Sequence, residues 1–197
     1  MTAMTQAQAR PPGLALDEDA RERARLSLLA LLGSGPLESL GMREAASAAG
    51  LGLATLYKYF GPKETLPHAV LAPELAGLIE DMDRASRTAV GVKARLRAVL
   101  DAMVHFSEAQ PHAASALWRH LPYSLWDEAD PDWRAQRQRI VAHIIRNGQH
   151  DGSVRKDLDG GALAGLIVGA ADAGLAARLS GAPPVDLFDA LWPLAAR

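Results

Sequence analysis

Residues 42–60 restrict the possible folds more than any other stretch, because two helical patterns meet there at a pair of glycines (MREAASAAGLGLATLYKYF). Gly50 ends the first helix, and as a glycine it can adopt the positive φ that a sharp bend requires. Gly52 then caps the second helix at little cost relative to serine. Ala46 supplies a small side chain where the two helices would cross. Short helices joined by such a turn are typical of a helix-turn-helix.

The rest of the chain has apolar residues at helical spacing, interrupted at glycine and proline clusters. No alternating apolar run is long enough to predict a strand. We therefore expect an all-α fold, in which a three-helix N-terminal helix-turn-helix domain precedes a larger helical domain. The predicted helices span residues 17–32, 42–49, 53–60, 66–88, 91–109, 112–126, 131–148, 158–180 and 185–195.

Composition excludes several classes of protein. The chain has 197 residues, half of them apolar, and no cysteine, so disulfides and thiolate chemistry are excluded. No apolar segment of signal-peptide length stands at the N-terminus, and we expect a cytoplasmic protein. Residues 161–179 are the most apolar stretch, but Asp172 and Arg178 within it argue against a membrane span. The net charge is −2 and the first 70 residues are neutral overall, so DNA binding would depend on where the charges lie.

Patterns for catalysis and metal binding are missing from the sequence. His143 and His150 would lie on one helix face, but no third metal ligand accompanies them. The sequence has neither a Gly-rich phosphate loop nor a nucleophile turn. We therefore expect no catalytic residue, no metal site and no cofactor.

Four motifs carry a family resemblance: Met42-Arg43-Glu44-x-Ala46, Ala49-Gly50-Leu51, Thr55-Leu56-Tyr57-x-Tyr59-Phe60 and Lys63-Glu64-x-Leu66. With these motifs the chain resembles the TetR family of transcription regulators, and residues 147–159 add a looser match. The resemblance implies a homodimeric repressor that a small molecule releases from a palindromic DNA operator. Residues 1–15 would be a flexible arm, 16–66 the DNA-binding domain, and 67–197 the effector-binding and dimerisation domain.

The same resemblance assigns the DNA contacts. Tyrosine hydroxyls and basic side chains would contact phosphates and fix the register, whereas three residues at the start of the second helix would discriminate bases. The chain departs from the family pattern at Gly41, Gly52 and Leu53, where family members commonly have polar residues. These departures affect which operator sequence the chain would bind more than whether it binds DNA. In the alternative interpretation the two tyrosines are half-buried core residues. The predicted DNA-binding residues are Arg43, Leu53, Ala54, Thr55, Tyr57, Lys58, Tyr59 and Lys63.

A ligand pocket is predicted where aromatic residues gather on neighbouring helices, in the part of the chain that holds the effector cavity in the family. Small-molecule cavities are mostly apolar with a few polar groups. A plain hydrophobic core is the alternative. The predicted ligand-binding residues are Met103, His105, Phe106, Trp118, Tyr123 and Trp126.

Small residues recur every four positions along the predicted helix 158–180, which would allow another helix to approach closely. Packing within the chain is one explanation, and a dimer interface is the one that the resemblance implies. The predicted dimerisation residues are Gly161, Gly165, Leu166, Gly169, Ala173 and Leu191. The rival function is a helical small-molecule-binding or scaffold protein whose helix-turn-helix does not read DNA.

Overall fold

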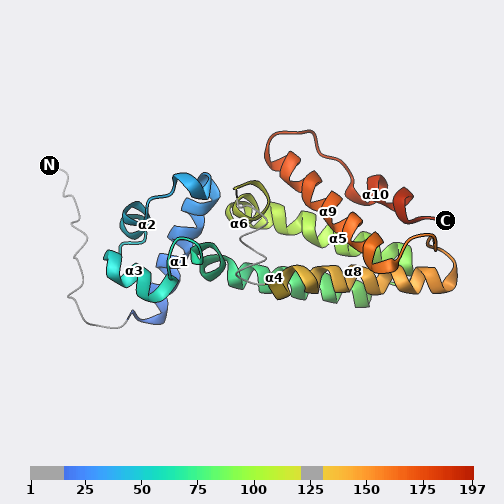
Figure 1. Ribbon diagram of the computed structural model, residues 1–197, viewed down its shortest axis with the longest axis horizontal. Coiled ribbons are helices and arrows are strands. Elements are labelled where there is room, and N and C mark those ends of the chain that lie inside the picture. Colours follow the sequence, from blue (N-terminus) through green and yellow to red (C-terminus); the bar gives the residue numbers. More distant parts are fainter. Residues whose placement is uncertain (1–15, 121–130) are drawn as a thin grey trace.

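The computed structural model describes residues 16–120 and 131–197, and it is elongated, with α1 to α3 at one end and the longer helices beyond them (Figure 1). The predicted arm over residues 1–15, and the predicted ligand residues Tyr123 and Trp126, lie outside the described residues. The elements are α1 (Glu18–Ser34), the 3₁₀ turn η1 (Leu37–Ser39), α2 (Met42–Ala48), α3 (Leu53–Phe60), α4 (Leu66–Thr88), α5 (Val92–Ala109), α6 (Pro111–Ala114), the π-helical turn η2 (Ser115–His120), α8 (Pro131–Asp151), α9 (Gly160–Leu179) and α10 (Leu187–Ala195).

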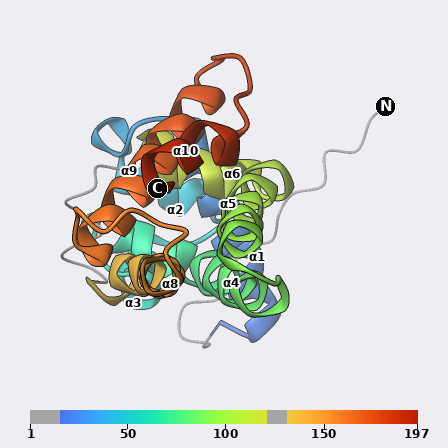
Figure 2. The same ribbon diagram turned by 90° about the vertical axis from the view of Figure 1, so that its right-hand side faces the viewer.

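Helices α4, α5, α8 and α9 form a bundle, which Figure 2 shows with α4, α5 and α8 nearly end-on. Within it α4 packs along α5, and α8 packs along α9, while α10 covers both α5 and α9. The buried apolar side chains form one cluster that continues from Ala24 in α1 to Ala195 in α10. A single core therefore supports both the helix-turn-helix and the bundle.

The all-α prediction is confirmed. The described residues contain no strand, only an isolated antiparallel bridge between Val154 and Ala196. Helices α3 and α4 have the predicted bounds, and α2 ends one residue before its predicted end.

Two predicted helix ends are too early. Gly33 was taken as part of a stop signal but lies inside α1, whereas α8 passes its predicted last residue, Gly148, and ends at the predicted break, Asp151-Gly152. Helix α1 continues through Gly33, where an added Cβ would lie 2.6 Å from the backbone oxygen of His112. Helix α8 continues past Gly148, where an added Cβ would lie 2.4 Å from Val154 Cγ2. Each glycine therefore permits a close approach by another part of the chain, and neither ends a helix.

The helix predicted over residues 112–126 is irregular in its described part. Helix α6 begins at Pro111, where a missing N–H costs no intrahelical hydrogen bond. The chain then changes to the π-helical turn η2 at Ser115. The described part of this segment is therefore two short turns of different kinds.

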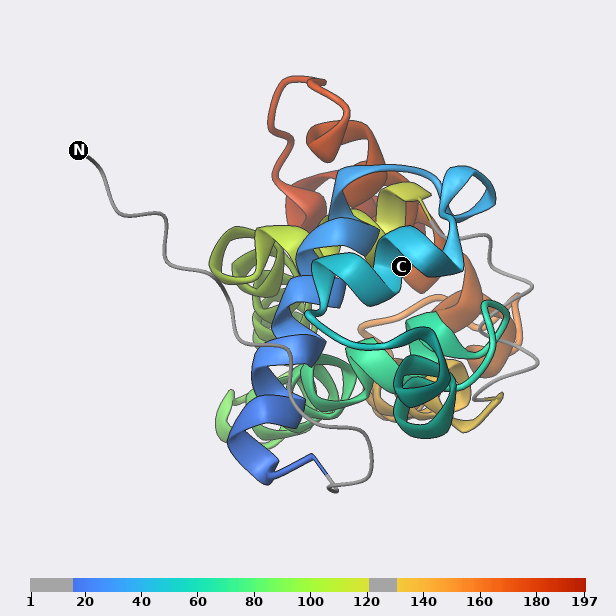
Figure 3. The same cartoon turned by 90° about the vertical axis from the view of Figure 1, so that its left-hand side faces the viewer.

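Helix α1 joins the helix-turn-helix to the bundle, at the end of the molecule that Figure 3 shows. It packs against α2 and also against α4, α6 and η2. The guanidinium of Arg25 donates hydrogen bonds from α1 to Glu74 Oε2 and to the Val70 carbonyl of α4, both at 2.7 Å. Helix α1 is therefore in contact with both the helix-turn-helix and the bundle.

Helix α9 is the one described helix that is long and apolar enough, by length and composition, to cross a membrane. In the fold it packs along α8, and its central Asp172 forms an ion pair with Arg137 of that helix. This is the arrangement of a core helix in a helical bundle.

Candidate nucleic-acid interface and ligand site

The turn between α2 and α3 is held by two backbone hydrogen bonds. The N–H of Leu51 donates to the Ala46 carbonyl at 2.8 Å, and the N–H of Gly50 donates to the Ser47 carbonyl at 3.1 Å. This helix ending needs a residue with positive φ, and Gly50 has a φ of 65°. Gly52 is the N-cap of α3. The roles predicted for both glycines are confirmed.

Helix α3 presents one face to the core and another to solvent. Leu56 and Phe60, one turn apart, are buried and fix the rotation of the helix about its axis. Thr55 is half-buried, and Arg43 of the preceding helix is exposed. The exposed positions on α3 itself are Leu53, Ala54, Tyr57 and Lys58. Seven of the eight predicted DNA-binding residues, the half-buried Tyr59 included, therefore lie on α2 and α3 with at least part of the side chain accessible.

Two of the eight, Tyr59 and Lys63, already make contacts within the chain. The hydroxyl of Tyr59 accepts a hydrogen bond from the backbone N–H of Leu16 at 3.1 Å, and its side chain is half-buried. The ammonium of Lys63 donates to the Glu38 carbonyl at 3.0 Å. Lys58 Nζ lies 5.3 Å from the centre of the Tyr59 ring. Tyr59 therefore ties the start of α1 to α3, while Tyr57 has the more accessible hydroxyl-bearing ring.

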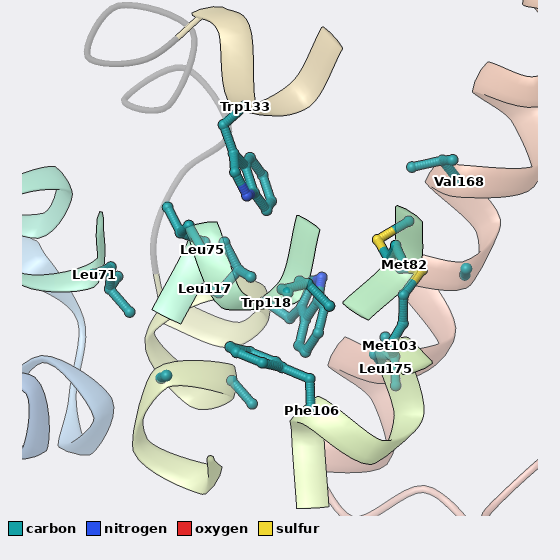
Figure 4. Close-up of a cluster of buried hydrophobic side chains, with 14 of the residues drawn as sticks. Leu71, Leu75, Met82, Met103, Phe106, Leu117, Trp118, Trp133, Val168 and Leu175 are labelled. Carbon is teal, nitrogen blue, oxygen red and sulfur yellow. The ribbon is translucent and has the colours of Figure 1, made fainter. Parts of the chain in front are cut away.

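Three of the predicted ligand residues come together in the bundle. Met103, Phe106 and Trp118 are all buried, and the Phe106 and Trp118 rings meet edge to face with centroids 5.6 Å apart (Figure 4). Trp133 of α8 extends into the same cluster. His105, by contrast, is exposed on the solvent side of α5. The sequence pattern therefore located the aromatic cluster, but its polar groups come from elsewhere.

Those polar groups are Arg137 of α8 and Asp172 of α9, which were not among the predicted site residues. Nη1 and Nη2 of Arg137 donate to the two carboxylate oxygens of Asp172 at 2.8 and 2.7 Å. The indole N–H of Trp118 donates to Oδ1 of the same carboxylate at 2.8 Å. The Arg137 guanidinium also lies over the Trp133 ring, with Cζ 4.2 Å from its centroid. An aspartate in the middle of an apolar helix was the available sequence signal for this buried pair.

The turn η2 is also connected to α1. Burial lowers the pKa of His120, the neighbouring charge of Arg119 lowers it further, and a hydrogen bond with the Gly33 backbone partly opposes both effects. The close approach of Gly33 to His112 lies at the same contact. The segment that carries Trp118 therefore rests on the helix that carries the helix-turn-helix.

The small residues of α9 divide into two groups. An added Cβ at Gly165 would lie 3.1 Å from Gln138 Nε2, so this glycine faces α8 of its own chain. An added Cβ at Gly169 would meet nothing within 4 Å. Gly169 and Ala173 are exposed, beside Leu166, which is 60% exposed. Leu191, predicted as a flank of the dimer interface, is buried inside the protomer.

Metal binding has no support in the described ranges, where no group of three or more His, Asp or Glu side chains could hold an ion.

This chain is similar to known proteins in its structure and not in its sequence. No protein-family model and no curated protein matches the sequence. The fatty acid degradation regulator FadR from Bacillus halodurans matches with a TM-score of 0.73 at 15% identity, over 91% of this chain and 94% of that chain. A TetR-like transcriptional regulator from Rhodococcus sp. RHA1 matches with a TM-score of 0.70 at 21% identity, over 91% and 96%. This chain has the TetR-family fold.

A third structure with this fold was solved with a bound molecule. FadR from Bacillus subtilis, in complex with stearoyl-CoA, matches with a TM-score of 0.71 at 16% identity, over 87% of this chain and 94% of that chain. Such likenesses extend over nearly the whole length of both chains, so the helix-turn-helix and the bundle of this chain together correspond to the TetR fold.

Proposed function

We propose that this chain is a TetR-like, ligand-responsive regulator of transcription, a repressor that a small molecule releases from a palindromic DNA operator. The supporting observation is the exposed face of α3, where Tyr57 and Lys58 stand beside the apolar Leu53 on a helix that follows a glycine turn. Residues 16–66 would bind DNA, and residues 67–197 would bind the effector and dimerise. The protein would act in the cytoplasm, without catalysis or a cofactor.

A palindromic operator requires a two-fold symmetric homodimer, with one recognition helix for each half-site. The solvent face of α9 suits this contact, because Gly169 and Ala173 would let a partner helix approach closely and Leu166 would supply apolar area. On α10 the exposed Leu194 replaces the buried Leu191 as the apolar flank of the interface.

Regulation would use the contact between η2 and α1. A ligand beside Phe106 and Trp118 would displace η2, and because η2 and α6 pack on α1, the helix-turn-helix would move with them. Two recognition helices fit successive major grooves only when they are roughly 34–36 Å apart. The ligand acts only to the extent that it binds the two arrangements with different affinity.

The test is DNA binding as a function of salt concentration, because phosphate contacts release counterions and give a steep dependence. Fluorescence anisotropy would compare the wild type with Lys58→Ala on α3 and with the matched control Lys93→Ala at the far end of the bundle. We expect Lys58→Ala to reduce the slope of log affinity against log salt by up to about one unit. Lys93→Ala should leave the slope unchanged.

A wild-type slope near zero would favour the scaffold interpretation over the regulator. Equal slopes for the wild type and Lys58→Ala would remove the exposed face of α3 from the DNA interface.

A further inference from the structure

An exposed apolar strip begins at the N-terminal end of α3. The side chains of Leu53 and Tyr57 are 36% and 45% exposed. They lie four residues apart on one helix, so they are neighbours on the same face. The exposed Ala54 extends the strip towards the side of α3 that faces away from the buried Leu56. The strip therefore lies at the end of α3 where a recognition helix contacts base edges.

The first turn of α3 has few groups that could read bases through hydrogen bonds. Adenine and guanine are read by the paired hydrogen bonds of Asn, Gln, Arg or Lys, and cytosine by Asp or Glu. Residues 53–56 are Leu, Ala, Thr and Leu, so the half-buried Thr55 is the one side chain there with a hydroxyl or other polar group. Thymine, by contrast, presents a methyl group in the major groove, which apolar side chains contact. The first turn of α3 therefore suits a methyl group better than a purine edge.

Lys58, the basic residue of α3, has its ammonium group on another flank of the helix. Lys58 Nζ lies 5.3 Å from the centre of the Tyr59 ring. Successive residues of an α-helix are about 100° apart around the axis, which puts Tyr59 and Tyr57 on opposite flanks. The ammonium therefore lies away from the flank of Tyr57 and Leu53, in a position that suits the phosphate contact proposed above.

We infer that α3 reads the C5-methyl group of pyrimidines through Leu53, so that 5-methylcytosine can replace thymine at the contacted position. These two bases carry a methyl group at the same ring position, whereas cytosine and uracil lack it. The inference rests on the proposed function, because it names the DNA chemistry that the recognition helix detects. Burial of one methyl group changes affinity about fourfold. A two-fold symmetric operator presents the contact twice, which gives about fifteenfold.

The experiment uses the operator that selection from random duplex DNA recovers, synthesised with each symmetric pair of thymines replaced in turn by deoxyuridine. Fluorescence anisotropy at one salt concentration would measure the affinity of the wild type for each duplex. We expect one pair of replacements to weaken binding about fifteenfold. At that pair, 5-methylcytosine opposite guanine should bind about fifteenfold more tightly than unmodified cytosine opposite guanine.

Leu53→Ala separates contact with the methyl group from any effect of the methyl group on DNA shape. The shortened side chain no longer reaches the methyl group, so the uracil penalty should fall to about twofold or less. A penalty caused by DNA shape would persist in this variant. Leu158→Ala is the matched control, because Leu158 is 37% exposed and lies outside the helix-turn-helix. It should show the full penalty, with circular dichroism checking the fold of both variants.

Equal binding of thymine and uracil duplexes at every position would overturn the inference, as would a uracil penalty that Leu53→Ala leaves unchanged. Either result would leave the proposed function standing if the wild type binds the operator with a steep salt dependence. Recovery of no operator, together with DNA binding that does not vary with salt, would overturn the proposed function and this inference with it.

Discussion

Replacing Arg25 by methionine should destabilise the protein strongly, because this side chain joins α1 to α4. Its guanidinium donates hydrogen bonds to the carboxylates of Glu22 and Glu74 and to the Val70 carbonyl. The shortest donor–acceptor distance to each of the three is 2.7 Å. The Arg25 and Glu74 side chains are only 10% and 9% exposed. The substitution would leave the Glu74 carboxylate buried without its arginine, at a cost of about 3–5 kcal/mol.

Removing both charges should be far milder. In the double variant Arg25→Met with Glu74→Met, no carboxylate remains buried, and the main loss is the hydrogen bond to the Val70 carbonyl, worth about 1 kcal/mol. The two single changes should therefore couple by roughly 2–4 kcal/mol. Urea unfolding followed by circular dichroism, at one protein concentration, would measure all three variants.

Arg84→Met is the matched control on α4. Arg84 contacts Asp81 at 2.8 Å, nearly the distance of the Arg25 pair, but its side chain is 66% exposed. We expect a change within about 0.5 kcal/mol, because solvent screens an exposed pair. A cost below about 1 kcal/mol for Arg25→Met would refute this reasoning, and so would a double variant as unstable as the single one.

Four further predictions follow from the described contacts. Tyr57→Phe should weaken binding to operator and random DNA by the same factor, since phosphate contacts carry no sequence information; anisotropy on both DNAs measures this, and a loss confined to the operator would contradict it. Leu53→Lys should change the preferred operator, because it adds a donor where we expect a thymine-methyl contact; a site selection that returned the wild-type consensus would remove Leu53 from the bases. Leu166→Glu should raise the dimer dissociation constant at least about tenfold in sedimentation, while Val90→Glu, at another exposed apolar position, should leave it unaltered. The lowered pKa of His120 means that the unfolded chain binds a proton that the folded chain resists, so stability should fall as pH drops below about 6.5. His120→Gln should lose that part of the pH dependence in urea unfolding at pH 5.5 and 7.5, and an unchanged dependence would assign it to other groups.

The helix-turn-helix could be predicted from the sequence because its signals are local. A positive φ at Gly50 and the cap at Gly52 depend on residues a few positions away, and the spacing of Leu56 and Phe60 fixes the buried face of α3. The internal Gly33 could not be interpreted in this way. In the sequence, a glycine inside a helix cannot be told from a glycine that follows a helix. Only the close approach of the His112 backbone shows that Gly33 lies inside α1.

The polar groups beside the aromatic cluster were harder to predict, because they come from distant segments of the chain. Asp172 was visible as a charge within an apolar helix, but its partner Arg137 lies 35 residues earlier in the chain. Nothing in the local pattern of α8 selects Arg137 from its neighbouring arginines. His105 was chosen for its chemistry, yet its place on α5 turns it towards solvent, while Phe106 beside it points into the core.

Selection of binding sites from random double-stranded DNA tests the central claim most directly, because the selection itself identifies the operator. A dimer with two α3 helices predicts an enriched inverted repeat, whose half-sites lie one helical turn apart, roughly 34–36 Å between centres, or a multiple of that distance. The selected DNA should bind two chains, and its affinity should fall steeply with salt. Recovery of no enriched sequence, or of a single unrepeated site bound by one chain, would contradict the account.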